Sequence, residues 1–423
     1  MGELPTCPFS NSKVDFVLRQ KGSEDNMEKP AICGGTPVRD TKIFYGHQYL
    51  DQADYDAVVE VLKSDYLTCG PKINELEAKL CKITGAKYAV VCSNGTAALH
   101  MAAMAAGIEK GDELITTPIT FAASANCALY CGATPVFADI NEKTYNIDPD
   151  SVEEHITSST KAVVAVDYTG QAVELDRLQA ICKKHNLVLI EDGAHSIGTK
   201  YNGKGVGSIA DMTTFSFHPV KTITGGEGGA VLTNSEEYYQ KLLLARSHGI
   251  TRTPELMEYE VDGPWYYEQV DLGYNYRLTD IQAGLIISQL DKLQMFSKRR
   301  KEIVARYNEA FADNDAIVVQ EEIPESDTTR HLYILRLNPE KLTINRREFF
   351  DALAAENVCC NVHYIPVYYF PHYQRLGYKK GLCPKAEKLY DEMITLPLYY
   401  GMSDQDCEDV IKAVEKIATY YHK

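Results

Sequence analysis

The sequence contains no long hydrophobic run. No stretch of its 423 residues approaches the roughly 18 consecutive apolar residues that cross a bilayer. Residues 1–30 also lack the continuous apolar segment of a secretory signal peptide. We therefore expect no membrane partner and predict a cytoplasmic protein.

Positive charge is scarce as well. Lysine and arginine number 43 against 59 aspartates and glutamates, which gives a net charge of −16. Proteins that bind nucleic acids usually present a broad basic face, and this composition does not provide one. We therefore expect no nucleic-acid partner. Any phosphate on a substrate has to be bound locally, by a few basic side chains or backbone N–H groups.

The twelve cysteines lack the regular spacing of a disulfide framework or a zinc site. The closest pairs are Cys127 with Cys131 and Cys359 with Cys360, and neither has a second pair at matching spacing. The sequence predicts free thiols in a reducing compartment and no metal centre. It also lacks internal repeats and low-complexity segments.

What the sequence does contain is a regular alternation of short apolar strands and helices of about ten residues. We predict strands at 88–92, 113–115, 135–138, 162–166, 188–190, 213–217 and 230–233, and helices at 51–63, 72–83, 96–106, 122–131, 150–156 and 175–185. Because the strands are apolar throughout, both faces of their sheet should be buried. The expected fold class is α/β with a mostly parallel sheet.

The length of the chain favours two or three domains. Residues 1–44 are polar and interrupted by proline and glycine, which is typical of an irregular arm. A large domain is expected over 45–294, and a small α+β domain over 295–423. The small domain should begin with a long charged helix at 295–315. Its other predicted elements are strands at 331–337 and 360–364 and helices at 346–356, 385–393 and 404–420.

A single lysine, Lys221, follows the predicted strand at 213–217 and precedes the glycine-rich turn 225–229. A lysine at such a strand end is a candidate Schiff-base nucleophile, although an isolated lysine after a strand is usually a solvated surface residue. Asp192 ends an earlier strand, 29 residues before the lysine. Taken alone, Asp192 could equally be a turn or helix-cap residue. Together, an acid and a lysine are what a pyridoxal phosphate site requires, because the acid can pair with the pyridine nitrogen.

Other strand ends carry polar or aromatic residues, and ligands of open parallel sheets bind at the carboxyl ends of the strands. The small-residue turn with Gly95 and Thr96 opens a helix whose N–H groups can bind an anion; an ordinary capped turn is the alternative. Phe121 could stack on a planar cofactor or belong to the core. His195 could bond the cofactor's phenolic oxygen or cap the next turn. Ser216 could contact a phosphate.

These residues belong to segments that resemble the DegT/DnrJ/EryC1/StrS family of sugar-nucleotide aminotransferases. The similarity runs from about residue 45 to the C-terminus. It rests on SNGTAAL (93–99), TTPITFAASAN (116–126), VDYTGQ (166–171), EDGAHSIG (191–198), FSFHPVKTITGGEGGAVLTN (215–234), RSHGI (246–250), GYNYRLTDIQAGL (273–285) and NVHYIPVY (361–368). The resemblance implies the aspartate-aminotransferase fold and pyridoxal phosphate as cofactor.

The resemblance also implies a role for each matching residue. Lys221 would bind the cofactor and shuttle protons, and Asp192 would pair with the pyridine nitrogen. The remaining cofactor contacts would come from Gly95, Thr96, Phe121, His195 and Ser216. Asn275 would reach the cofactor phosphate of a neighbouring subunit, so that a homodimer would share its sites. Arg277, His363 and Tyr364 would lie on the substrate side.

Within the family, residues 166–171 and 215–229 most resemble members of the pseudaminic acid pathway. The implied reaction transfers an amino group from glutamate to C4 of a UDP-linked 4-keto-6-deoxy-N-acetylhexosamine, with ping-pong kinetics. Another ketosugar nucleotide, of the perosamine, bacillosamine, legionaminic or aminoarabinose type, is an alternative. A non-catalytic cofactor-binding regulator is a second alternative. An NAD enzyme is disfavoured because residues 203–207 lack the G-x-G-x-x-G spacing. The segment CGGTPVRD (33–40) is left without a role.

Overall fold

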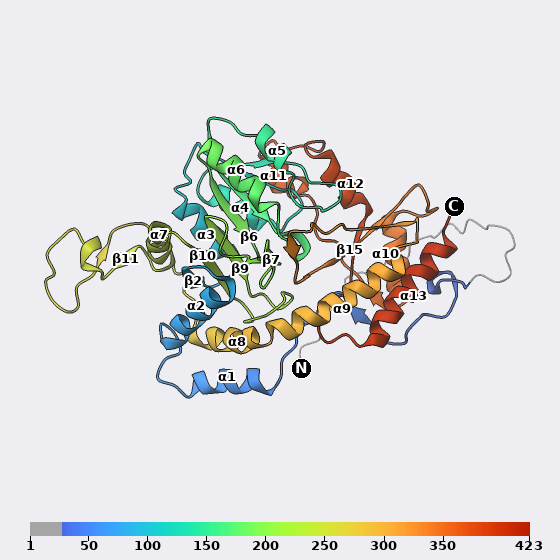
Figure 1. Ribbon diagram of the computed structural model, residues 1–423, viewed down its shortest axis with the longest axis horizontal. Coiled ribbons are helices and arrows are strands. Elements are labelled where there is room, and N and C mark those ends of the chain that lie inside the picture. The colour runs from blue at the N-terminus through green and yellow to red at the C-terminus, as the bar shows by residue number, and fades with distance from the viewer. Residues whose placement is uncertain (1–27) are drawn as a thin grey trace.

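The computed structural model describes residues 28–423, and its centre is a seven-stranded sheet (Figure 1). The strands lie in the order β2-β10-β9-β6-β5-β3-β4. Their bounds are β2 Tyr88–Cys92, β3 Glu113–Thr116, β4 Thr134–Phe137, β5 Thr160–Val166, β6 Val188–Asp192, β9 Met212–Ser216 and β10 Gly229–Thr233. Only β10 runs antiparallel to its neighbours among these seven. The predicted α/β class with a mostly parallel sheet is confirmed.

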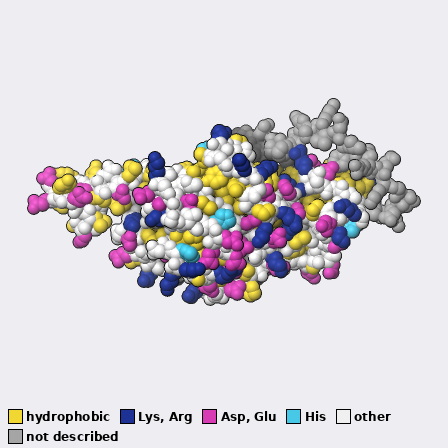
Figure 2. All heavy atoms as spheres, turned by 90° about the horizontal axis from the view of Figure 1, so that it is seen from above, with side chains coloured by type: hydrophobic (Ala, Val, Ile, Leu, Met, Phe, Trp, Pro, Cys, Tyr) yellow, Lys and Arg dark blue, Asp and Glu magenta, His cyan; other side chains and the backbone are white. Residues whose placement is uncertain are grey.

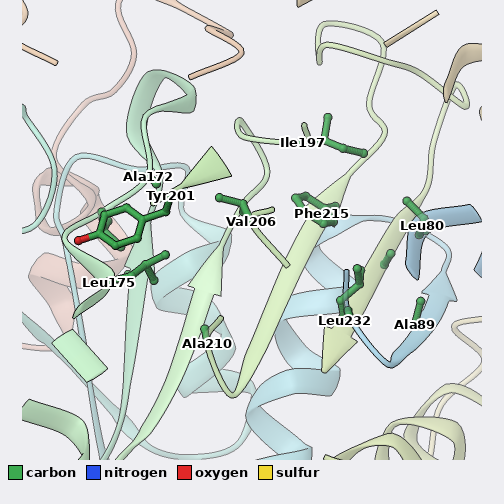
Figure 3. Close-up of a cluster of buried hydrophobic side chains, with 14 of the residues drawn as sticks. Leu80, Ala89, Ala172, Leu175, Ile197, Tyr201, Val206, Ala210, Phe215 and Leu232 are labelled. Atoms are coloured by element: carbon green, nitrogen blue, oxygen red, sulfur yellow. The ribbon is translucent and has the colours of Figure 1, made fainter. Parts of the chain in front are cut away.

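Helices cover both faces of this sheet, because consecutive apolar residues of each strand point to opposite sides. Val91 packs into a core with the helices α2 (Pro71–Thr84), α6 (Leu175–His185) and α8 (Asp280–Asp291). Val90 packs into a second core with α3 (Gly95–Ala105), α4 (Ala123–Tyr130) and α7 (Glu236–Arg246). Figure 3 shows part of the first core, where Leu80, Phe215 and Leu232 lie around the sheet.

The parallel strands place their carboxyl ends at one edge of the sheet. β6 ends at Asp192, β9 ends at Ser216, and β2 ends just before α3 begins. The antiparallel β10 starts at this same edge, since its Gly229 is in register with both Ser216 and Cys92. The loops that follow β2, β6 and β9, which carry candidate functional residues, therefore converge there.

The C-terminal part of the chain has its own core. It starts with the long helix α9 (Leu293–Phe311). A three-stranded sheet of β13 (Ile317–Val319), β15 (Tyr333–Leu337) and β17 (Met393–Leu396) follows, with helices α10 (Arg346–Ala355) and α13 (Asp404–Tyr420). The short helix α5 (Pro149–Glu154) packs into the first core through Val152. The short helices α11 (Pro371–Arg375) and α12 (Pro384–Glu392) contribute Tyr373 and Leu389 to a further buried cluster. A strand pair between β7 (Lys200–Tyr201) and β14 (Ser326–Asp327) connects the two predicted domains, whose exact division stays a prediction.

One predicted element of this part is wrong. The strand predicted at 360–364 is instead the two-residue β16 (Val358–Cys359), and a single bridge between Asn361 and Thr395 follows it. The chain then leaves the ladder, and His363 turns its ring toward Thr395. The helix predicted at 385–393 is present as α12, and it stops at Glu392 because Met393 already pairs with β15.

The described part of the predicted N-terminal arm, residues 28–44, is packed against the C-terminal core. β1 (Ile43–Phe44) pairs in parallel with β16, and Ile43 is buried in that core. A helix, α1 (Gln52–Leu62), follows and packs against α8. Residues 1–27 of the predicted arm lie outside the described residues.

A hairpin built on β11 (Ile250–Thr251) and β12 (Glu268–Gln269) projects from the body at the left of Figure 1. Tyr259 and Trp265, in the loop between these strands, are 72% and 68% exposed. Figure 2 shows acidic and hydrophobic side chains together on this projection. Within residues 28–423, no helix has both the length and the apolar character needed to cross a membrane.

Candidate active site

A cavity of about 930 Å³ opens where the strand ends converge. Its wall includes residues that follow β2, β3, β6 and β9, together with Tyr45 and residues from the 274–276 and 363–364 loops. Lys221, Asp192, His195, Gly95, Thr96, Phe121, Ser216, His363 and Tyr364 all line it. Most residues that the sequence singled out as separate candidates therefore surround one space.

Lys221 follows β9 in a tight turn, in which its N–H donates to the carbonyl of His218 at 2.9 Å. The side chain is only partly exposed and borders the cavity. Burial lowers the pKa of Lys221 from its ordinary value to about 8, and the negative charge of Asp192 opposes that change. About a tenth of this amine is consequently neutral and nucleophilic at pH 7, far more than for an ordinary lysine.

Asp192 is buried at the end of β6. Its Oδ2 accepts a 2.6 Å hydrogen bond from the hydroxyl of Ser124, and its Oδ1 accepts from the N–H of Ala194 at 3.1 Å. Burial raises the pKa of Asp192, while these hydrogen bonds and the charge of Lys221 counteract the increase. A cationic ring nitrogen in the cavity would favour the carboxylate further.

His195 lies three residues beyond Asp192 and is also buried. Its Nε2 is 3.1 Å from the hydroxyl of Tyr364, and its ring is 4.6 Å from the ring of His331. Its Nδ1 has no hydrogen-bond partner among residues 28–423. Burial lowers the pKa of His195 well below the ordinary range, so the imidazole is neutral.

The start of α3 forms a small cradle against the end of β9. Asn94 caps the helix by accepting from the N–H of Ala97 at 2.8 Å, which leaves other N–H groups of the first turn available. A Cβ on Gly95 would lie 2.9 Å from the Cβ of Ser216, so glycine is needed for this approach. The helix N-terminus, Thr96 and Ser216 together can bind a phosphate.

Two aromatic side chains, Phe121 and Tyr364, also line the cavity. Phe121 is 63% exposed, which excludes the alternative that it is a core residue. Its ring is 6.4 Å from that of Tyr364 in an edge-on arrangement. The Nδ1 of His363, the residue before Tyr364, forms a 2.9 Å hydrogen bond with the hydroxyl of Thr395. Burial lowers the pKa of His363 to about 3.

Two predicted residues do not line this cavity in the described chain. Asn275 is exposed, and Arg277 is partly exposed. Their neighbours Tyr274 and Tyr276 do line the cavity, with rings stacked 5.1 Å apart. Asn275 lies on the surface, where it is accessible to a neighbouring subunit. Its contact with that subunit's cofactor stays a prediction.

Sequence reasoning missed several residues of the site. Tyr45 reaches the cavity from the predicted arm, and its ring is 5.0 Å from that of His363. Ser124 holds Asp192 from α4. Both act on residues distant in sequence, and Tyr45 belongs to no recognisable local pattern. Ser124 does lie within the 116–126 motif, which was the one available signal.

Two further acids, Asp167 and Glu191, lie outside the lining of the cavity. Both are fully buried, and besides this burial the negative charge of Glu191 helps to raise the pKa of Asp167. The hydroxyl of Ser196 donates to Asp167, and that of Thr213 donates to Glu191 at 2.8 Å. Burial raises the pKa of Glu191 to about 7 and raises that of Asp167 as well. This pair therefore retains a proton near neutral pH. Within residues 28–423, no cluster of His, Cys, Asp and Glu is arranged to hold a metal ion.

Comparison with known proteins gives a consistent result. A transaminase of Campylobacter jejuni, named for UDP-4-amino-4,6-dideoxy-N-acetyl-beta-L-altrosamine, is 39% identical over 371 residues, 87% of this chain and 95% of that protein. The solved structure of Helicobacter pylori PseC, an aminotransferase of pseudaminic acid biosynthesis, is 34% identical with a TM-score of 0.83, covering 90% of this chain and 100% of that one.

A Streptococcus pneumoniae protein solved in its PLP form is 32% identical with a TM-score of 0.83, over 90% of this chain and 99% of that one. The sequence pattern of the DegT/DnrJ/EryC1/StrS aminotransferases matches residues 48–415. The similarity predicted from the eight sequence motifs is confirmed. Because the family match spans most of the described residues, the chain belongs to the DegT/DnrJ/EryC1/StrS aminotransferase family.

Proposed function

We propose that the protein transfers an amino group from glutamate to C4 of a UDP-linked 4-keto-6-deoxy-N-acetylhexosamine, with pyridoxal phosphate as cofactor. The observation that carries this proposal is the convergence of Lys221, Asp192 and His195 on one cavity beside an anion-binding helix N-terminus. The named transaminases of Campylobacter jejuni and Helicobacter pylori support the choice of substrate.

The residues present fit pyridoxal phosphate. Asp192 is a buried acid without a lysine or arginine hydrogen-bonded to it in the described chain, which suits a protonated pyridine nitrogen. The unpartnered Nδ1 of His195 and the cradle of Gly95 and Ser216 offer further polar contacts. We assign the phosphate to Gly95, Thr96 and Ser216, and one face of the ring to Phe121.

When bound, pyridoxal phosphate supplies an electron-accepting ring that weakens the bonds at the donor's α-carbon. Lys221 then moves the proton at that carbon, a task for which its lowered pKa suits it, since its neutral amine is a base. Asp192 holds the proton on the ring nitrogen. His195, which stays neutral, orients its neighbours through the Tyr364 hydroxyl.

The substrate side of the cavity is assigned to His363 and Tyr364. Both border the cavity, and their loop follows β16 and is held by the bond of His363 to Thr395. The cavity volume of about 930 Å³ is near the upper end of the range for pockets that bind small molecules. A contact of Arg277 with the substrate stays a prediction, since Arg277 does not line the cavity.

We further propose that the active unit is a homodimer in the cytoplasm. Several large apolar side chains of α1 and the following loop are exposed, namely Tyr55, Val59, Leu62, Tyr66 and Leu67. Exposed apolar patches of this kind mark protein interfaces. Asn275 is exposed beside the cavity-lining Tyr274 and Tyr276, as expected of a residue that serves a neighbour's cofactor.

The substrate assignment is tested by product analysis. The purified protein is incubated with pyridoxal phosphate, glutamate and a panel of UDP- and dTDP-linked 3-keto and 4-keto sugars. The proposal predicts 2-oxoglutarate and a 4-amino sugar from the UDP-linked 4-keto-6-deoxy-N-acetylhexosamine. Parallel double-reciprocal lines are expected, because the two substrates react in separate half-reactions. Turnover confined to another sugar of the panel would contradict the substrate, and intersecting lines would contradict the mechanism.

A further inference from the structure

Residues 45–49 border Lys221 on two sides. Tyr45 lines the large cavity together with Lys221. His47, Gln48 and Tyr49 line a separate small cavity of about 10 Å³, and Lys221 lies in its wall too. This segment, which we call the strap, therefore covers a side of Lys221 that does not face the large cavity.

Both ends of the strap are fixed by hydrogen bonds. The carbonyl of Tyr45 accepts from the N–H of Leu398 at 3.1 Å. The carbonyl of Tyr49 accepts from Nε2 of Gln289 at 3.0 Å, and its ring is 4.7 Å from that of Tyr400. The strap thus runs from the C-terminal part of the chain to α8, past the reactive amine.

The chain before the strap is attached to one buried carboxylate. Glu356, the residue that ends α10, is fully buried. Its Oε1 accepts from the N–H of Ala31 at 2.7 Å, and its Oε2 accepts from the N–H of Val38 at 2.9 Å. Most of residues 33–40, the segment that the sequence left without a role, therefore lies between two hydrogen bonds to the same side chain.

Lys416 completes this attachment. Its Nζ donates to the carbonyl of Thr36 at 2.7 Å and forms an ion pair with Glu356 at 3.2 Å. Both charged side chains are buried, so the loss of either one would leave an unpaired charge in the interior. β1 ends at Phe44, and the strap begins at the next residue, Tyr45.

We propose that the strap keeps water away from Lys221, and that Glu356 is the positioning residue that holds the strap in place through residues 31–44. The proposal rests on the proposed function only in taking Lys221 as the reacting amine. It gives the 33–40 segment a part in the reaction although that segment does not border the large cavity.

The expected effect concerns the basicity of Lys221. Loss of water around an amine disfavours its charged form, which is why burial lowers the pKa of Lys221 to about 8. A displaced strap would admit water and raise that pKa toward the ordinary lysine value. Other ionisable groups near the lysine would remain in place: Asp192, His195, His218, Glu227, Arg300, His331, His363 and Tyr364.

The test measures the pKa of Lys221 in the full chain freed of cofactor. A trace of an amine-acylating reagent is applied at a series of pH values, and labelling of Lys221 is followed by peptide mass spectrometry. Glu356→Gln keeps the size of the side chain but removes its charge and one acceptor. In this variant we expect the titration midpoint of Lys221 to rise by about one pH unit relative to the unmodified chain.

The matched control is Glu392→Gln. Glu392 is also a largely buried glutamate of the C-terminal part and pairs with Arg336 at 2.6 Å, but it borders neither cavity. Its substitution should leave the midpoint unchanged. An equal shift in the control would show general loosening and overturn the role of Glu356.

Tyr45→Ala tests the strap directly, and it is decisive if Glu356→Gln fails to fold. It should raise the midpoint in the same direction. An unchanged midpoint in Tyr45→Ala would overturn the strap, and an unchanged midpoint in folded Glu356→Gln would overturn its positioning role. Because no substrate or cofactor is used, failure here is separate from failure of the substrate assignment.

Discussion

The hydroxyl of Ser124 donates a 2.6 Å hydrogen bond to Oδ2 of Asp192, between residues 68 positions apart in the sequence. The bond joins the first turn of α4 to the end of β6. It helps to keep Asp192 ionised, because a hydrogen bond to a carboxylate lowers the pKa that burial raises.

Ser124→Ala should therefore raise the pKa of Asp192 and weaken its pairing with the cofactor ring. We expect the rate of the glutamate half-reaction to fall about tenfold at neutral pH, in line with the loss of one hydrogen bond to a charged group. Stopped-flow absorbance measures this rate. Ser288→Ala is the matched control, since its hydroxyl donates to Asp54 at 2.7 Å, and Ser288 does not line the cavity. Equal rates in the two variants would contradict the assignment.

Gly95→Ala should weaken cofactor binding. The added Cβ would lie 2.9 Å from the Cβ of Ser216 and would push α3 away from β9. We expect affinity for pyridoxal phosphate to fall at least about tenfold, as measured by titration of the apoprotein. Gly401→Ala serves as control, because its nearest neighbour would be 3.7 Å away. Unchanged affinity in Gly95→Ala would show that the phosphate binds elsewhere.

Asn275→Ala and Lys221→Ala should complement each other if the dimer shares its sites. Each variant alone should be nearly inactive. A mixture refolded or exchanged together would contain heterodimers in which one site has both wild-type residues, and we expect about a quarter of wild-type activity. The absence of recovery in a verified heterodimer would show that Asn275 acts within its own chain.

The buried pair of Asp167 and Glu191 should make stability depend on pH. Burial raises the pKa of Glu191 from 4.5 to about 7, so the folded protein binds more protons than the unfolded chain between these values. The free energy of unfolding should consequently fall as pH rises from 5 to 7.5, by on the order of 1 kcal/mol or more from this group.

Glu191→Gln should flatten that dependence, because an amide has no proton to lose. Urea unfolding at the two pH values measures the difference. Glu392→Gln is the control, because Glu392 is paired with Arg336. The unfolding free energy of this variant should keep the wild-type dependence on pH. A wild-type slope in Glu191→Gln would show that Glu191 is ionised throughout this range.

The sequence predicted the sheet well and the site incompletely. β2 and α6 have the predicted bounds, because each is a clear apolar pattern between turn residues. α8 was recognised as part of a family motif but not as a helix. The strand predicted at 360–364 failed because its apolar and aromatic residues serve the cavity rather than a ladder. Tyr45 and Glu356 could not be found from the sequence, and Ser124 was included only as a member of the 116–126 motif, since their roles depend on contacts between distant segments.

The central claim is that Lys221 binds the cofactor and that the protein accepts an amino group from glutamate. The most direct measurement is the absorption spectrum of the purified protein with pyridoxal phosphate, before and after excess glutamate. We expect a visible band that is lost in favour of a near-ultraviolet band on addition of glutamate, and neither change in Lys221→Ala. A protein that stays colourless with pyridoxal phosphate, or a Lys221→Ala variant with the wild-type spectrum and response, would contradict the account.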